Sequence, residues 1–218
     1  MSDAMKYSSS EAIARSQTRT LFSQTMWYVA ATAGTFTVGA YLGRNMSYHL
    51  IWVWFIAALG CLFAMRASVR KNPGLTVPLL LGFGVLMGLA TSPTLVYYSS
   101  TDPAAVWRAG AATALFILGF GTAGYTTRRD LSALARVCFF ALLGLIIAGI
   151  VLIFVHIPAA DMLYSVLGLV IFAGLTAFDF QRLRRGTTAT DNPAMLAASI
   201  FLDAQNVFLF FLRIFSRN

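Results

Sequence analysis

The sequence predicts an all-α integral membrane protein, a bundle of seven transmembrane helices with the last helix in the centre. Of its 218 residues, 58% are hydrophobic and only 11% are charged, and the mean hydropathy is +0.73. A soluble domain is ordinarily about a quarter charged, so lipid must cover the apolar surface. The apolar residues also fall in long runs separated by charged breaks, and the last run is the most polar.

Runs of about 18 or more apolar residues with few charges mark helices able to cross a hydrocarbon core about 30 Å thick. We expect a polar arm at residues 1–21, followed by a membrane domain at residues 22–218. The seven runs of that domain are 22–42, 48–65, 75–98, 107–126, 134–156, 161–181 and 194–214. Charged residues, prolines or glycines end each run, as is typical of connecting loops. The breaks are Arg44-Asn45, Arg70 to Gly74, Thr101 to Pro103, Arg128 to Asp130, His156 to Pro158, and Arg184 to Pro193.

Basic residues alternate between the two sides of the predicted bundle. Four segments on one side hold three basic residues each: Lys6, Arg15 and Arg19; Arg66, Arg70 and Lys71; Arg128, Arg129 and Arg136; Arg182, Arg184 and Arg185. The loops on the other side hold only Arg44 and Arg108. Because cytoplasmic loops carry an excess of Lys and Arg, we expect the N-terminus in the cytoplasm.

The last run has two interpretations. Seven crossings place Arg213 and Arg217 outside, against the charge bias, and Asp203 lies in the middle of the run. The run is either a full span enclosed by the other six or a re-entrant segment that returns to the cytoplasm. Polar structure at membrane depth survives only where protein or water surrounds it. Both interpretations make this helix central.

Small residues recur at four-residue spacing, which lets helices approach closely. The pairs are Gly39 and Gly43, Gly84 and Gly88, Gly119 and Ala123, and Gly144 and Ala148. Gly119, Gly121 and Gly124 also match a G-x-G-x-x-G dinucleotide pattern. That pattern requires a strand before it and a helix after it, whereas here it lies inside an apolar run. We interpret the dinucleotide match as a false positive and the four-residue pairs as helix packing.

Two aspartates, Asp179 and Asp203, are the only acids within the predicted spans, because Asp161 stands at the very start of its run and the other acids lie in the arm or the loops. A carboxylate at the centre of a membrane helix costs about 2.5–3.5 kcal/mol on insertion scales, so it usually faces a partner or a water-filled cavity. If the two acids meet, they cannot both ionise at low cost; they share a proton and titrate as a pair. Once deprotonated, the same oxygens suit a hard cation such as Ca²⁺. The pair is therefore a candidate proton-sensitive Ca²⁺ site, although each acid could instead only bond a neighbouring helix.

Three further residues are candidate members of this site. Arg66 ends the second span on the same side of the membrane and is the natural counter-ion, unless it is an ordinary interfacial arginine. Thr176 lies three residues before Asp179, and Asn206 lies three residues after Asp203, so each shares a helix face with its aspartate. They are candidates to orient the carboxylates, or they are interhelical hydrogen-bonding residues without a further role.

Several function classes are excluded by the residues present. The net charge of +8 is dispersed among the loops, which argues against a nucleic-acid partner. A retinal photoreceptor needs a lysine within the bundle, but Lys6 and Lys71 both lie outside the spans. Cys61 and Cys138 lack metal-ligand spacing. No hydrolase or nucleotide-binding pattern occurs, so we expect neither an enzyme nor a cofactor.

Four segments resemble the Bax inhibitor-1 family. They are Thr126 to Ser132, Gly174 to Asp179, Phe201 to Phe208, and Gly84 to Gly88 continuing to Ser92-Pro93. The resemblance runs from the first span to the C-terminus and implies a seven-helix membrane fold with the last helix central. It also implies a place in a bacterial cytoplasmic (inner) membrane.

The resemblance implies a pH-sensitive calcium-leak channel, because bacterial relatives are implicated in that activity with paired aspartates in helices 6 and 7. It carries the pH-sensor roles to Asp179 and Asp203, and the arginine role to Arg66. The second span contains no acid, unlike that of some relatives, so a second proton sensor is not expected. Other bacterial relatives are linked to a membrane-protease complex. The alternative is therefore a non-conducting regulator of a membrane-protein partner.

Overall fold

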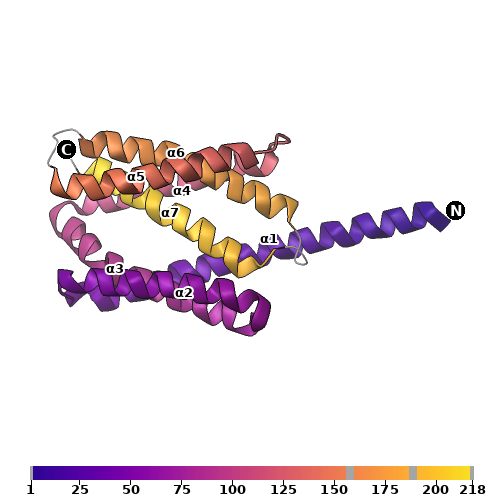
Figure 1. The fold of residues 1–218 in the computed structure, drawn as a ribbon, viewed down its shortest axis with the longest axis horizontal. Coiled ribbons are helices and arrows are strands. Elements are labelled where there is room, and N and C mark those ends of the chain that lie inside the picture. The colour runs from indigo at the N-terminus through magenta and orange to yellow at the C-terminus, as the bar shows by residue number, and fades with distance from the viewer. Residues whose placement is uncertain (1, 156–159, 187–190, 217–218) are drawn as a thin grey trace. The chain divides into compact units, whose positions relative to one another are not determined.

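A computed structural model describes residues 2–155, 160–186 and 191–216, and all the regular elements in these ranges are helices (Figure 1). The seven α-helices of the described residues are α1 (Ser2–Leu42), α2 (Ile51–Lys71), α3 (Thr76–Thr101), α4 (Pro103–Thr126), α5 (Ser132–Phe154), α6 (Ala160–Arg185) and α7 (Pro193–Phe215). Short 3₁₀ turns at Gly43–Asn45, Tyr48–Leu50 and Pro73–Leu75 lie in the connections. The all-α prediction is confirmed.

Six of these helices, α2 to α7, are long and apolar enough to cross a membrane. The predicted first span, 22–42, lies in α1, which begins at Ser2, so the predicted arm and first span form one helix. A membrane crossing by α1 stays a prediction. The last helix, α7, is continuous over 23 residues, as a full span requires.

Two of the spans begin with caps that the sequence encodes. Before α4, the Asp102 carboxylate accepts a hydrogen bond from the backbone N–H of Ala105 at 3.1 Å. Before α7, the Asn192 side-chain oxygen accepts from the N–H groups of Ala194 and Met195 at 3.0 and 3.2 Å. Each cap satisfies donors that the first helical turn leaves unbonded, and each is followed by a proline, which suits the first helical position.

The chain divides into two compact units. The first unit contains Met1–Pro93 and Arg182–Phe201. Within it α1 and α3 approach closely, because a Cβ atom at Gly39 would overlap the backbone of Val85 and one at Gly88 would overlap the carbonyl of Phe36. The predicted close packing is therefore confirmed for these glycines.

The second unit contains Thr94–Gln181 and Leu202–Asn218. Here α4 packs closely on α6: a Cβ atom at Gly124 would overlap the backbone of Ala177. Gly119 and Gly144 have no neighbouring atom within 4 Å of a Cβ position, so the packing predicted for these two glycines is wrong. The glycines of α4 that face α6 are instead Gly121 and Gly124, the other two members of the G-x-G-x-x-G match.

The most buried of the six candidate spans is α7. Of its most apolar window, 56% is buried, compared with 11% for α2 and 11% for α5. Protein therefore covers the polar residues of α7, as its composition predicts.

Candidate functional site

Asp179 in α6 and Asp203 in α7 lie in the same compact unit, and both are buried. The exposed fractions of the two residues are 7% and 5%. Both lie within candidate spans, and because both are buried, protein atoms surround them. Burial of an acid at this depth calls for polar or charged partners.

The two carboxyl groups are close enough to interact electrostatically. A third polar side chain joins them: the Thr176 hydroxyl, which is fully buried, donates a hydrogen bond to Oδ2 of Asp203 at 3.1 Å. Sequence spacing assigned Thr176 to the face of Asp179. Its hydroxyl in fact bonds the acid of the other helix, and so it links α6 to α7 at the level of the pair.

The other two predicted site residues have different surroundings. The Asn206 amide donates to the backbone carbonyl of Leu202 at 2.8 Å, which engages this donor with its own helix. Arg66, near the end of α2 in the first unit, has an exposed side chain. The supporting role of Asn206 and the counter-ion role of Arg66 stay predictions.

Helices α4 and α5 pack closely on the part of α6 that contains Asp179. A Cβ atom at Gly121 would lie 3.1 Å from ring atoms of Phe180. On the α5 side, a Cβ atom at Gly174 would overlap the sulfur of Cys138. Together with the contact of Gly124 and Ala177, these positions press α4 and α5 against α6. The acids therefore sit in a tightly packed part of the unit.

An apolar layer lies beside the acid pair, toward the C-terminal end of α7. It consists of Leu145, Phe172, Val207 and Phe210, all buried and in mutual contact. The ring centroids of Phe172 and Phe210 are 5.9 Å apart. Val207 is one helical turn beyond Asp203, so this cluster lies next to the acid pair on the C-terminal side of α7. We call it the apolar layer.

Gln181 is an important residue that sequence reasoning missed. It is 2% exposed, and its side chain bonds the loop between α4 and α5 twice. Its oxygen accepts from the N–H of Leu131 at 2.9 Å, and its amide donates to the carbonyl of Arg129 at 2.6 Å. A polar residue two positions after an intramembrane aspartate was the available signal. Its position at the end of the predicted span 161–181 gave no indication that its side chain bonds the loop between α4 and α5.

The metal-binding capacity of the pair is limited. Among the described residues, no group of three or more His, Cys, Asp or Glu side chains converges. Calcium in proteins takes about 6–8 oxygen ligands, and two carboxylates supply at most four. Water or backbone carbonyls would have to complete the shell, which suits a passing ion better than a resident one.

A family model described as inhibitor of apoptosis-promoting Bax1 matches residues 18–218. The chain belongs to the Bax inhibitor-1 family. The resemblance found in the sequence is thereby confirmed.

Bacterial relatives align over most of the chain. It is 34% identical over 212 residues to a protein of Deinococcus radiodurans, covering 91% of this chain and 90% of that protein. It is 30% identical over 199 residues to the inner membrane protein YbhL of Escherichia coli K12, covering 87% and 82%. It is 31% identical over 169 residues to a membrane protein of Streptococcus pyogenes serotype M1, covering 75% and 72%. The six candidate spans of this chain agree with the description of the relatives from Escherichia coli and Streptococcus pyogenes as membrane proteins.

Proposed function

We propose that this Bax inhibitor-1 family protein is a passive, pH-sensitive calcium leak, in which Asp179 and Asp203 form the proton sensor. One observation supports the proposal above all others. Two carboxyl groups on neighbouring membrane helices are buried together within electrostatic reach. In a medium of low dielectric constant, their joint ionisation is strongly disfavoured, so the protonation state of the pair couples to its geometry.

In the proposed mechanism, a shared proton removes the repulsion between the two carboxyl groups and keeps α6 and α7 together, while the apolar layer blocks the route beyond. Loss of the proton leaves two like charges that repel each other and favour separation of the helices. Arg66 then attracts one of the carboxylates, and a hydrated cation enters. No enzymatic step and no cofactor is involved, and calcium is the transported ion.

The proposal includes a placement in the membrane. The protein lies in a bacterial inner membrane with its N-terminus in the cytoplasm, and α1 to α7 form a seven-helix bundle with α7 at its centre. The charge bias of the loops supports the orientation. The burial of α7 supports its central place in the bundle. The relative YbhL is described as an inner membrane protein, which supports the proposed location in the inner membrane.

A second function is favoured by a different observation. The spans of α2 and α5 are only 11% buried, so large helix faces are available to lipid or to another membrane protein. A non-conducting regulator would use such faces to bind a membrane protease or another membrane partner, and the acid pair would then serve bundle stability alone.

Reconstitution into liposomes separates the two functions. Full-length protein is incorporated into vesicles loaded with a fluorescent calcium indicator, and calcium entry is recorded while the external pH is varied. Asp203→Ala removes one member of the pair. Thr113→Val is the matched control, because Thr113 is a buried residue of the same unit whose hydroxyl bonds its own helix at Ala109.

A leak predicts flux that responds to pH, persists in Thr113→Val and is lost in Asp203→Ala. Wild-type flux no greater than that of empty vesicles would refute the leak and favour the regulator. A calcium titration of purified protein at several pH values, wild type against Asp179→Asn/Asp203→Asn, tests binding separately. A pH-dependent calcium affinity that survives the double substitution would exclude this pair as the cation site.

A further inference from the structure

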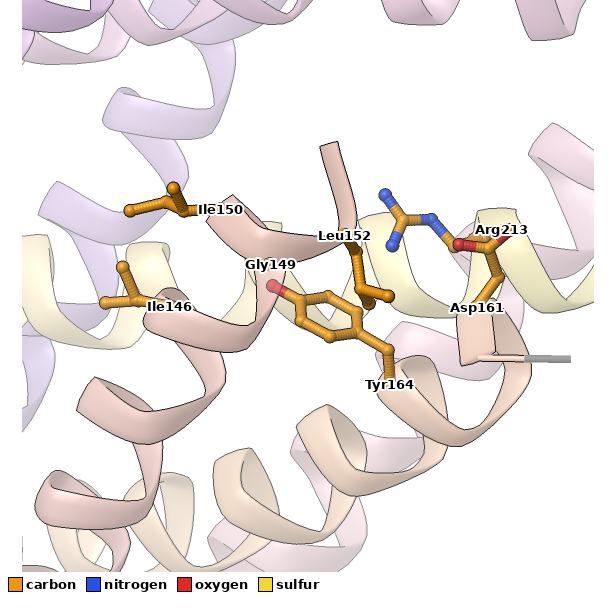
Figure 2. A pocket seen from close by; sticks show the side chains of 7 residues that line it. All are labelled: Ile146, Gly149, Ile150, Leu152, Asp161, Tyr164 and Arg213. Atoms are coloured by element: carbon orange, nitrogen blue, oxygen red, sulfur yellow. The ribbon is translucent and has the colours of Figure 1, made fainter. Parts of the chain in front are cut away.

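The second unit has two adjoining cavities far from the acid pair. The first, about 380 Å³, lies between the C-terminal part of α5, the start of α6 and the end of α7. Figure 2 shows Ile146 and Ile150 of α5 on one side of it and the charged side chains of Asp161 and Arg213 on the other. The Tyr164 ring reaches between them toward α5. This cavity is amphipathic, with an apolar wall and a charged wall.

The second cavity, about 630 Å³, shares Asp161 and Arg213 with the first. Its other lining residues come from the ends of α3 and α7 and the start of α4, and they are mostly polar. They include Asp102, the Tyr98 side chain and Ser216. The charged wall of the first cavity therefore continues into a polar chamber.

Arg213 is held in place at the junction. Its guanidinium carbon lies 5.4 Å from the centroid of the Tyr164 ring, within the range of a cation–π interaction. The side chain is nevertheless exposed. Arg213 and Asp161 both belong to the part of the chain that the structure describes, and no ion pair within 4 Å joins them there. The two opposite charges are thus separated and available to a ligand that carries both signs.

The cavities lie at the level expected of phospholipid headgroups. Asp161 is in the first turn of α6. At a rise of 1.5 Å per residue, the stretch of α6 from Asp161 to Gln181 is about 30 Å long, which equals the usual hydrocarbon thickness. Tyrosines such as Tyr98 and Tyr164 are also typical of this interface. Along α7, Arg213 is about 15 Å from Asp203, so this site is separate from the acid pair.

The geometry points to a binding site for a zwitterionic phospholipid with a primary ammonium group, such as phosphatidylethanolamine. Its phosphate accepts hydrogen bonds from Arg213, and its ammonium donates to Asp161. Its acyl chains lie along Ile146 and Ile150. The polar chamber contains two carboxylates, Asp102 and Asp161, against one guanidinium. This balance favours a headgroup of both signs over a purely anionic one, which the acids would repel.

Native mass spectrometry of the full-length protein in detergent tests this inference. Dioleoyl phosphatidylethanolamine, phosphatidylcholine and phosphatidylglycerol are titrated separately, with glycerophosphoethanolamine as a headgroup that lacks acyl chains. We expect phosphatidylethanolamine to bind most tightly and the soluble headgroup to compete poorly. Arg213→Gln should weaken phosphatidylethanolamine binding about tenfold, equivalent to about 1.4 kcal/mol. Arg108→Gln is the matched control, because Arg108 is an exposed arginine in the first turns of α4 that lines neither cavity.

A second variant tests the preference for one lipid over another. A folding defect would weaken the binding of all the lipids and would not lower this preference selectively. Asp161→Asn keeps the size of the side chain and removes one negative charge, so the preference for phosphatidylethanolamine over phosphatidylglycerol should fall. Equal retention of the three lipids by the wild type would overturn the inference. So would equal weakening by Arg213→Gln and Arg108→Gln, an unchanged preference in Asp161→Asn, or competition by the soluble headgroup as strong as that of the lipid.

Discussion

Replacing Thr176 with valine tests whether Asp203 changes its protonation state inside the membrane domain. Valine has nearly the shape of threonine, so the change leaves packing intact and removes only the 3.1 Å hydrogen bond to Asp203. Such a bond contributes about 0.5–1.5 kcal/mol when its acceptor is neutral and about 1.5–3 kcal/mol when its acceptor is charged. The destabilisation caused by Thr176→Val should therefore grow by about 1 kcal/mol as Asp203 ionises.

Thermal unfolding of the purified protein in detergent, from about pH 5 to about pH 9, measures this change. A difference of 1 kcal/mol shifts the midpoint by about 2–4 °C in a chain of this size. The midpoint of Thr176→Val should fall further below that of the wild type as the pH rises. In the control Thr113→Val, the lost bond ran to the backbone carbonyl of Ala109 at 2.7 Å, an acceptor that does not titrate. Its deficit should be independent of pH. Equal deficits for Thr176→Val at both ends of the pH range would refute the reasoning.

Three other changes test the surroundings of the pair. Phe210→Ala removes a ring from the apolar layer; it should cost about 3–5 kcal/mol and raise calcium flux at acid pH in liposomes, whereas Phe139→Ala, at a side chain that is 53% exposed, should do neither. Gln181→Leu removes two hydrogen bonds to the loop between α4 and α5; hydrogen exchange of that loop should rise, and unchanged exchange would deny the residue this role. Gly124→Ala should destabilise the protein strongly because its Cβ would overlap the backbone of α6, while Gly119→Ala, with open space around it, should not; equal midpoints for the two variants would contradict the packing.

The sequence predicted the helices well because their signal is the length and polarity of each run. Five predicted spans, from 75–98 to 194–214, begin and end within a few residues of α3 to α7, apart from the part of 134–156 that lies outside the described residues. The helix that contains the first predicted span, 22–42, was only partly predicted, because the polar residues before 22 gave no sign that this helix begins at Ser2. A hydropathy pattern shows where a helix crosses, and it carries little information on helical residues outside the membrane.

The sequence predicted how deep the site residues lie in their membrane helices, but not which neighbouring helix each side chain faces. Asp179 and Asp203 stood out because acids are rare in apolar runs, and the structure buries both. Spacing assigned Thr176 to Asp179, although its hydroxyl bonds Asp203. The four-residue spacing also predicted close packing at Gly119, which has open space around it, and did not include Gly124, whose Cβ position overlaps the backbone of α6. Which way a residue points depends on the rotation of each helix against its neighbours, and residues from several helices decide that rotation together.

The burial of α7 has a consequence for biosynthesis. This helix follows the other six in the chain, so it leaves the ribosome after them, yet it is the span that protein covers most completely. Until it arrives, the faces of α6 and α4 that will contact it must be covered by lipid, by water or by an insertion factor. A chain that ended before Pro193 would lack Asp203, so the hydrogen bond from Thr176 that links α6 to α7 could not form.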